Sequence, residues 1–123
     1  MDQTFLQVLE HEGPVTIIAP YASPAPVVNT WMSYVKLNSE QTELYLPAAG
    51  MRSIEHVLPD DDRLLLTFGS KAVMGTEGPG AGFHVSGKGY FIADGPIYEE
   101  MKEQFPWLRK VLAVKITAVT QKI

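Results

Sequence analysis

The chain has 123 residues, of which 46% are hydrophobic and 20% are charged, and its formal net charge is −4. This length and composition predict one globular domain, residues 1–123, that buries a core without metal or disulfide support. The negative charge argues against a nucleic-acid interface, and the adjacent cations Arg109 and Lys110 are expected to be solvated surface. No apolar run approaches the roughly 20 residues that cross a membrane. The N-terminus lacks a secretion signal, so we expect a cytoplasmic protein. Because cysteine is absent, any redox activity needs a bound cofactor.

The order of apolar patterns and turn signals predicts a mainly β domain. Alternating runs rich in β-branched and aromatic residues indicate strands, proline and glycine mark the turns, and the first two strands are expected to form a hairpin. With about six strands and short flanking helices, the expected fold is a small β-barrel. The elements expected in chain order are a helix at 2–12, strands at 15–19, 27–36 and 43–47, a helix at 52–58, strands at 64–68 and 83–92, a helix from 94–96 to 105, and a strand at 111–120.

Three local features of this plan carry specific expectations. The run Leu64–Phe68 is almost continuously apolar, which predicts that both of its faces are covered, one of them by barrel closure or by a dimer interface. Residues 70–82 are rich in glycine and proline and are expected to form a loop. Asp94 is expected to cap the helix that follows it.

The segment Val28–Lys36 has strand composition but carries polar and aromatic side chains on both faces. Because side chains alternate along a strand, Asn29 and Trp31 share one face, and Thr30 and Tyr34 share the other. An aromatic wall beside a few fixed hydrogen-bonding groups suits a flat ligand with heteroatoms at its edge. A strand buried between two layers is the alternative interpretation.

Other candidate motifs do not predict a specific chemistry. The glycine-rich stretch 75–82 does not fit a dinucleotide-binding motif, and 82–89 lacks the Ser or Thr that completes a P-loop. The run Asp60–Asp62 is typical of a solvated turn, and the three histidines share no metal-ligand spacing. No catalytic side chain and no metal site are therefore predicted. Trp107, just beyond a helix, is expected either to pack in the fold or to contact a ligand or partner.

Several short motifs occur together in a specific order and spacing, from Glu12-Gly13 to Trp107. They are Val28-Asn29-Thr30-Trp31, Ser33-Tyr34, Lys36, Pro47, Gly50-Met51, Asp62-Arg63, Leu65, Thr67, Gly69-Ser70, Gly75, Gly78-Pro79-Gly80, Gly82-Phe83 and Asp94-Gly95-Pro96. In this arrangement the chain resembles the small bacterial FMN-binding proteins of the pyridoxamine 5′-phosphate oxidase-like split-barrel superfamily.

The resemblance implies a split β-barrel that forms a homodimer, with one FMN per subunit at the dimer interface. It also implies electron transfer or other flavin-based redox chemistry, with a redox partner that the sequence does not identify. The alternatives are a flavin-dependent reductase or oxidase of a small substrate, and a module that binds another flat ligand without redox chemistry. The implied cofactor-binding residues are Val28, Asn29, Thr30, Trp31, Tyr34, Ala48, Ala49, Gly50, Met51, Arg52, Ser53, Ile54, Trp107 and Ile123.

The resemblance assigns these residues to different parts of the cofactor. Residues 29–31 would line the flavin ring with Tyr34 nearby, and the turn at 48–51 would bring backbone groups to the edge of the ring. Trp107 and Ile123 would reach the flavin of the neighbouring subunit. An aliphatic chain end at that position would exclude water from the flavin.

The phosphate end of the implied site departs from the family pattern. Where these proteins typically have Lys-Thr, this chain has Ser53-Ile54, so a cation and a hydroxyl group are lost. We hypothesise that Arg52 supplies a bidentate contact instead and that Ser53 adds a neutral donor.

Overall fold

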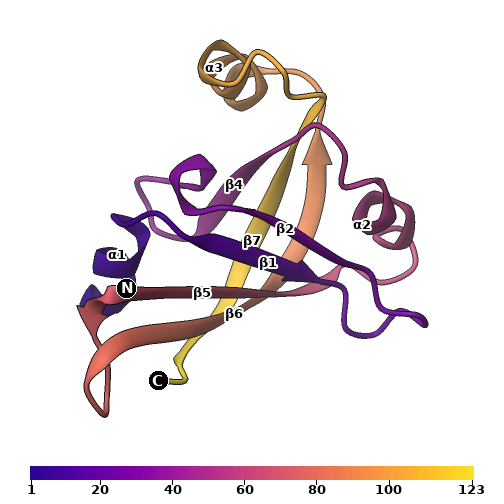
Figure 1. Cartoon of the computed structure of the whole chain (residues 1–123). Coiled ribbons are helices and arrows are strands. Elements are labelled where there is room, and N and C mark those ends of the chain that lie inside the picture. Colours follow the sequence, from indigo (N-terminus) through magenta and orange to yellow (C-terminus); the bar gives the residue numbers. More distant parts are fainter.

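One antiparallel sheet of seven strands curls into a half-barrel in the computed structural model, which describes all 123 residues (Figure 1). The strand order is β2-β1-β5-β6-β7-β4-β3. None of the helices is long and apolar enough to cross a membrane. The elements are α1 (Gln3–Leu9), β1 (Pro14–Ile18), β2 (Val27–Trp31), the 3-10 helix η1 (Met32–Tyr34), β3 (Lys36–Leu37), β4 (Glu43–Ala48), α2 (Arg52–Val57), β5 (Arg63–Met74), β6 (Pro79–Ile92), α3 (Pro96–Gln104) and β7 (Lys110–Gln121).

The expected mainly β architecture and the β1–β2 hairpin are confirmed. The strand expected at 27–36 is wrong beyond Trp31, because the chain makes a 3-10 turn there and then pairs with β4 as the separate strand β3. The carboxylate of Glu12 accepts hydrogen bonds from the backbone N–H of Ser33 at 3.0 Å and from its hydroxyl at 2.7 Å. This contact holds the turn, so side-chain alternation describes only the residues up to Trp31.

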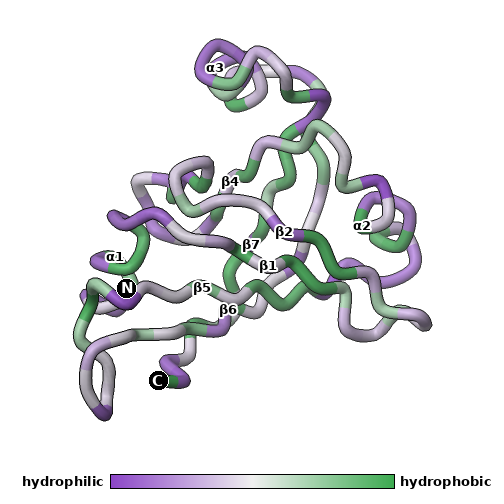
Figure 2. The backbone as a smooth tube through the Cα atoms, in the orientation of Figure 1, coloured by the Kyte–Doolittle hydropathy of each residue, from purple (hydrophilic) through white to green (hydrophobic).

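Helix α1 packs against strands β5 and β6 and supplies an aromatic ring to the core. Phe5 is fully buried, and its ring centroid lies 5.3 Å from that of Phe68 and 5.4 Å from that of Phe83. Burial of such a side chain contributes roughly 1.5–3 kcal/mol. Asp2 caps the helix by accepting a hydrogen bond from the backbone N–H of Thr4 at 2.7 Å. Figure 2 shows hydrophobic and hydrophilic residues interspersed along the strands, as expected for a sheet with one buried face.

The loop expected at 70–82 is mostly sheet, because β5 continues to Met74 and β6 begins at Pro79. The glycines of this region allow close approach instead of forming a long loop. A Cβ atom added to Gly75 would lie 2.1 Å from the carbonyl oxygen of Gly80, and one added to Gly82 would lie 2.8 Å from the Ile123 side chain. Glycine composition alone does not distinguish these two uses.

Within strand β5, the apolar run is covered fully on only one face. Leu64, Leu66 and Phe68 are buried, whereas Leu65 and Thr67 are half-buried. The expectation that both faces are covered is therefore not met within a single chain.

Helix α3 lies beyond the ends of strands β6 and β7 (Figure 1). The expected cap is wrong, because Gly95 with a φ of 92° occupies the N-cap position and no side chain caps the helix. Pro96 begins the helix, where its fixed φ is favourable and its missing N–H costs nothing. A small second core joins the helix to the sheet, with Tyr34 packed against it, and consists of Met101, Phe105, Leu108 and Val111.

Candidate functional site

A shallow hollow of about 250 Å³ lies where strand β2 meets the turn that follows strand β4. These strands lie near opposite edges of the sheet, so the curl of the sheet brings them together at its open seam (Figure 1). Ten residues line the hollow, and all except Pro47 belong to the set that the sequence resemblance implies. The lining residues are Val28, Asn29, Thr30, Trp31, Tyr34, Pro47, Ala49, Gly50, Met51 and Trp107.

Two side chains offer unused hydrogen-bonding groups to this hollow. Thr30 is 7% exposed and is the one buried polar residue of the chain. Its hydroxyl has no partner within the chain, and it lines the hollow without being sealed from it. The side-chain oxygen of Asn29 accepts from the hydroxyl of Thr16 at 2.8 Å, which leaves its NH2 group free to donate. Both groups are available to a ligand with heteroatoms at its edge.

Aromatic rings form the other part of the lining. Trp31 is 50% exposed and Trp107 is 48% exposed, so the fold leaves half of each large side chain uncovered. The ring of Tyr34 lies 5.3 Å from that of Trp107 and 5.3 Å from that of Phe105, between centroids. Tyr34 and Phe105 pack against Trp107, and the exposed half of the Trp107 side chain remains free for stacking.

The turn after β4 brings open backbone to the hollow. A Cβ atom added to Gly50 would have no neighbour within 4 Å, so there is free space beside this residue. Met51 has a φ of 59°, in the left-handed region that residues other than glycine rarely adopt. Together with the aromatic rings and the hydroxyl of Thr30, this open backbone fits the flat, heteroatom-edged flavin ring that the resemblance implies.

Arg109 contacts this turn without lining the hollow, and the expectation that it is only solvated surface is wrong. Its backbone N–H donates to Ala48 O at 2.8 Å, its Nε to Ala49 O at 3.3 Å and its Nη2 to Gly50 O at 2.9 Å. The turn and the arginine are far apart in sequence, and only the pairing of β4 with β7 brings them together. No local sequence signal could have identified this contact.

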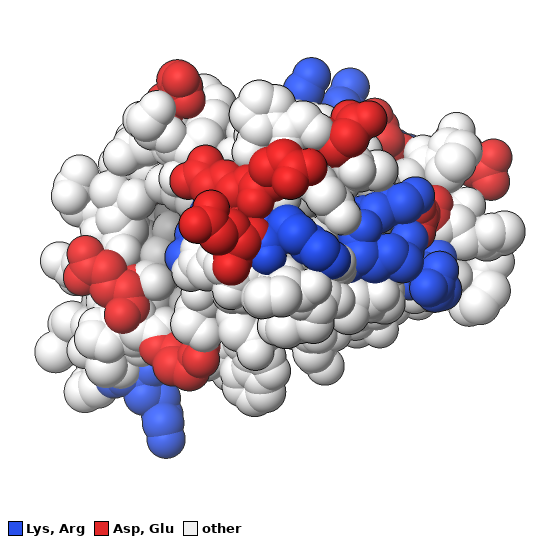
Figure 3. Space-filling view, turned by 90° about the horizontal axis from the view of Figure 1, so that it is seen from above, with Lys and Arg blue, Asp and Glu red and all other residues white.

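Glu55 of α2 connects the same arginine to a second cation. Its carboxylate oxygens accept from Arg109 Nη2 at 2.8 Å and from Lys110 Nζ at 2.6 Å. The hydrogen bonds from Lys110 and then Arg109 hold the pKa of the Glu55 carboxyl below its usual range, despite the opposing effect of burial. Figure 3 shows the face of the molecule that lies at the top in Figure 1. Lys and Arg side chains form a band on this face with acidic side chains beside it, so charges of both signs meet there.

The hollow at the sheet seam, lined by residues such as Thr30, Gly50 and Trp107, is called the ring hollow below. The residues implied for the phosphate are not gathered around it. Arg52 is exposed and lines no hollow, and Ile54 is fully buried, so the Ile54 side chain points into the core. Ser53 is exposed and lines a different hollow of about 620 Å³ together with His56 and the loop 21–26. No lysine or arginine lines that hollow.

Two further residues of the implied set lie outside the ring hollow. Ala48 is fully buried and does not line it. Ile123 is 60% exposed and lies beside Gly82, whose backbone N–H donates to its carbonyl oxygen at 3.1 Å. One chain therefore does not bring Ile123 to its own ring hollow.

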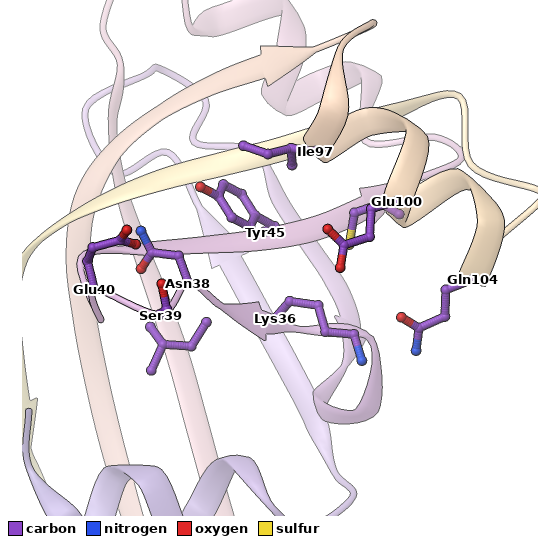
Figure 4. Close-up of a pocket in the computed structure, with 10 residues that line it drawn as sticks. Lys36, Asn38, Ser39, Glu40, Tyr45, Ile97, Glu100 and Gln104 are labelled. Carbon is purple, nitrogen blue, oxygen red and sulfur yellow. The ribbon is translucent and has the colours of Figure 1, made fainter.

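A hollow of about 480 Å³ lies elsewhere, between helix α3 and strands β3 and β4. Figure 4 shows Lys36, Tyr45 and Glu100 around it. The hydroxyl of Tyr45 donates to the Glu43 carboxylate at 2.9 Å, and burial together with that carboxylate raises the pKa of Tyr45 to about 12. None of the residues implied for the cofactor lines this hollow, so its larger volume does not make it the flavin site.

One known protein is similar to this chain over nearly its whole length. No protein-family model matches the chain. The chain is 36% identical over 120 residues to the FMN-binding protein of Nitratidesulfovibrio vulgaris (strain Miyazaki F), covering 98% of this chain and 97% of that protein.

Solved structures of low sequence identity share the fold. HupZ of Group A Streptococcus has a TM-score of 0.73 at 10% identity and covers 98% of this chain and 93% of its own. An FMN-binding protein from Syntrophomonas wolfei has a TM-score of 0.64 at 10% identity, with coverages of 89% and 76%. A pyridoxinephosphate oxidase family protein from Clostridium acetobutylicum, related to general stress protein 26, has a TM-score of 0.64 at 14% identity, with coverages of 99% and 90%. The chain belongs to the FMN-binding protein family, on the pyridoxamine 5′-phosphate oxidase-like split-barrel fold.

Proposed function

We propose that this protein binds FMN non-covalently in the hollow at the sheet seam and uses it for electron transfer as a homodimer. The observation that carries the proposal is the convergence of Thr30, Trp31 and Trp107 on one hollow. The hydroxyl of Thr30 has no partner there, and both tryptophans are about half exposed. When bound, FMN would supply the redox chemistry, because no side chain around the hollow is assigned a catalytic role.

The chain's own residues would bind and orient the ring. Thr30 and Asn29 would hydrogen-bond to heteroatoms at its edge, and Trp31 would provide stacking area. The open space beside Gly50 would let the backbone approach the ring closely. Val28, Tyr34 and the residues of the turn would complete the lining.

Homodimerisation would complete the site, because the hollow in one chain is small for such a ligand. Its volume of about 250 Å³ lies below the roughly 300–1,000 Å³ of pockets that bury small molecules. Val27 is 58% exposed and Ile123 is 60% exposed, so apolar surface remains uncovered near the sheet edge and at the chain end. A second copy would cover such surface and bring its Ile123, and also Trp107, to the neighbouring flavin.

The phosphate would lie near the start of α2. Arg52 is exposed and forms no ion pair, so its guanidinium is free to contact a phosphate oxygen. Ser53 is also exposed and would add a hydroxyl donor, whereas Ile54 could contribute only backbone.

Reconstitution with FMN tests the proposal. We expect the purified protein to be yellow, to contain one FMN per subunit, to sediment as a dimer and to bleach on reduction with dithionite. A colourless protein that takes up no added FMN would overturn the proposal. Steady oxidation of a nicotinamide donor would instead indicate the reductase alternative, and uptake of other planar molecules but no flavin would indicate a non-redox binding module.

A further inference from the structure

We infer that Arg109 is a positioning residue of the flavin site, which holds the turn at 48–51 so that the backbone N–H groups of Gly50 and Met51 point into the ring hollow. There they would donate to the acceptor edge of the ring. This inference rests on the proposed function, and it concerns a residue outside the hollow that touches no ligand itself.

The geometry of the peptide groups carries the first step. Arg109 donates to Ala49 O at 3.3 Å and to Gly50 O at 2.9 Å, so both carbonyls point toward the guanidinium. The Ala49–Gly50 and Gly50–Met51 peptide bonds are trans. In a trans peptide, the C=O and the following N–H point in opposite directions. The N–H groups of Gly50 and Met51 therefore point away from Arg109.

The second step is that these two donors are unused. Neither the N–H of Gly50 nor that of Met51 donates to a backbone or side-chain acceptor within the chain. Both residues line the ring hollow, whereas Arg109 does not. Two adjacent free donors beside open space suit the oxygen and nitrogen acceptors at the edge of a flavin.

The arginine is itself fixed, and its shape matters. Glu55 accepts from Arg109 at 2.8 Å, and the backbone N–H of Glu55 donates to Met51 O at 3.0 Å, so the turn, helix α2 and strand β7 form one connected unit. The planar guanidinium contacts two carbonyls and one carboxylate at once. A lysine keeps the charge but cannot reproduce this fork. The connected unit also holds Met51 in its left-handed conformation.

Paired titrations with FMN and riboflavin test the inference, because riboflavin has the same ring but no phosphate. We expect Arg109→Met and Arg109→Lys to weaken the binding of both ligands by the same factor, about tenfold, because donors to the ring are misplaced. Lys110→Met is the matched control, since Lys110 also contacts Glu55 but touches no turn carbonyl. In this control we expect both dissociation constants to stay within about threefold of wild type.

The reduction potential of bound FMN provides a readout that a purely structural role would not change. Reduction adds charge to the ring edge, so lost N–H donors should weaken binding of the reduced form more than of the oxidised form. A tenfold difference corresponds to a two-electron potential about 30 mV lower. Circular dichroism of each variant verifies that it is folded, and Arg109→Lys serves if Arg109→Met does not fold.

The outcomes separate this inference from the function on which it rests. Arg109 variants that bind both ligands as wild type does would overturn the inference alone. Weakening of FMN but not riboflavin would show that Arg109 acts on the phosphate, and it would also overturn the inference. A wild-type protein that binds neither ligand would overturn the proposed function and the inference together.

Discussion

The turn at 48–51 and helix α2, which follows it directly, differ in how the fold holds the residues that they offer to a ligand. In the turn, Arg109 binds two consecutive carbonyls, and the backbone conformation is fixed from outside the hollow. In α2, Arg52 and Ser53 are exposed and neither forms a side-chain hydrogen bond or ion pair within the chain. The proposed ring-binding half is thus assembled by the sheet, whereas the proposed phosphate-binding half depends on exposed side chains.

This difference arises because strands and short surface helices fix side-chain positions to different degrees. Strand pairing holds β2 against β1, and β4 against β7, with the precision of a hydrogen-bonded register. A short surface helix with one buried side chain, Ile54, provides no comparable register for the side chains on its exposed face. We expect substitutions in the ring half to affect all flavins, and those in the phosphate half to affect only phosphorylated ones.

The largest expected effect is that of Trp31→Ala. Removing a half-exposed ring from the wall of the hollow should cost about 2 kcal/mol of binding, or roughly thirtyfold in affinity, for FMN and riboflavin alike. Fluorescence titration with each ligand measures this change. The comparison between the two halves would break if riboflavin binding were unchanged.

Ile123→Glu comes next, because the proposed site borrows this side chain from the second copy. A carboxylate brought against the flavin in a dry interface should weaken FMN binding by roughly tenfold and loosen the dimer. The residue is 60% exposed in one chain, so the stability of the isolated subunit should not change. Sedimentation analysis at several concentrations, with and without FMN, measures both effects. Wild-type values for both would argue against a shared site.

Thr30→Val keeps the shape of the side chain and removes only its hydroxyl. We expect it to weaken binding of both flavins by about 1 kcal/mol, the net contribution of one hydrogen bond. The hydroxyl has no partner within the chain, so the melting temperature without ligand should not fall. A lower melting temperature combined with unchanged affinity would show that Thr30 serves the fold and not the ligand.

A smaller effect, confined to FMN, is expected for Arg52→Ala. The exposed guanidinium should contribute about 0.5–1 kcal/mol at low salt and less at high salt, because its charge is screened. Riboflavin binding should not change, which provides the internal control. Unchanged FMN affinity at low salt would remove Arg52 from the phosphate site and would leave that half of the cofactor without an identified cation.

The smallest effect concerns pH and the Glu55 ion pairs. The pKa of Glu55 is lowered in the folded state, so its contribution to stability is present above the usual glutamate range and is lost as the pH falls through the lowered pKa. Glu55→Gln should lack this part of the acid-induced loss. Comparing thermal unfolding of the two proteins between neutral pH and about pH 3 measures it, and parallel curves would contradict the expectation.

Most of the fold follows from local patterns. The exceptions arise where contacts with residues that are not immediate neighbours in sequence decide the structure. Strand β2 and its alternating side chains are predicted correctly as far as Trp31, because alternation is a property of a few adjacent residues. The strand ends where it does because Glu12, far away in sequence, binds Ser33. The length of β5 and β6 was missed because their glycines serve close packing instead of turns.

The residues of the candidate site also divide into those that local sequence identifies and those that depend on long-range pairing. Residues of the ring hollow could be identified by motif, since the two segments that line most of it are short and continuous. Arg109 could not, because its role depends on the pairing of β4 with β7 and on the direction of two carbonyl groups. The side chain of Ile54, which belongs to the implied set, is buried in the core instead.

Because the sheet has an open seam, a ligand bound there would also restrain the fold. A molecule seated across β2 and the end of β4 would act as a cross-link between two edges of one sheet that no strand pairing joins. At a ligand concentration of one hundred times the dissociation constant, such a cross-link would stabilise the folded chain by about 2.7 kcal/mol. Slower amide hydrogen exchange should be concentrated in β2 and around the turn at 48–51, so cofactor loading would rigidify the part of the barrel that the backbone leaves unclosed.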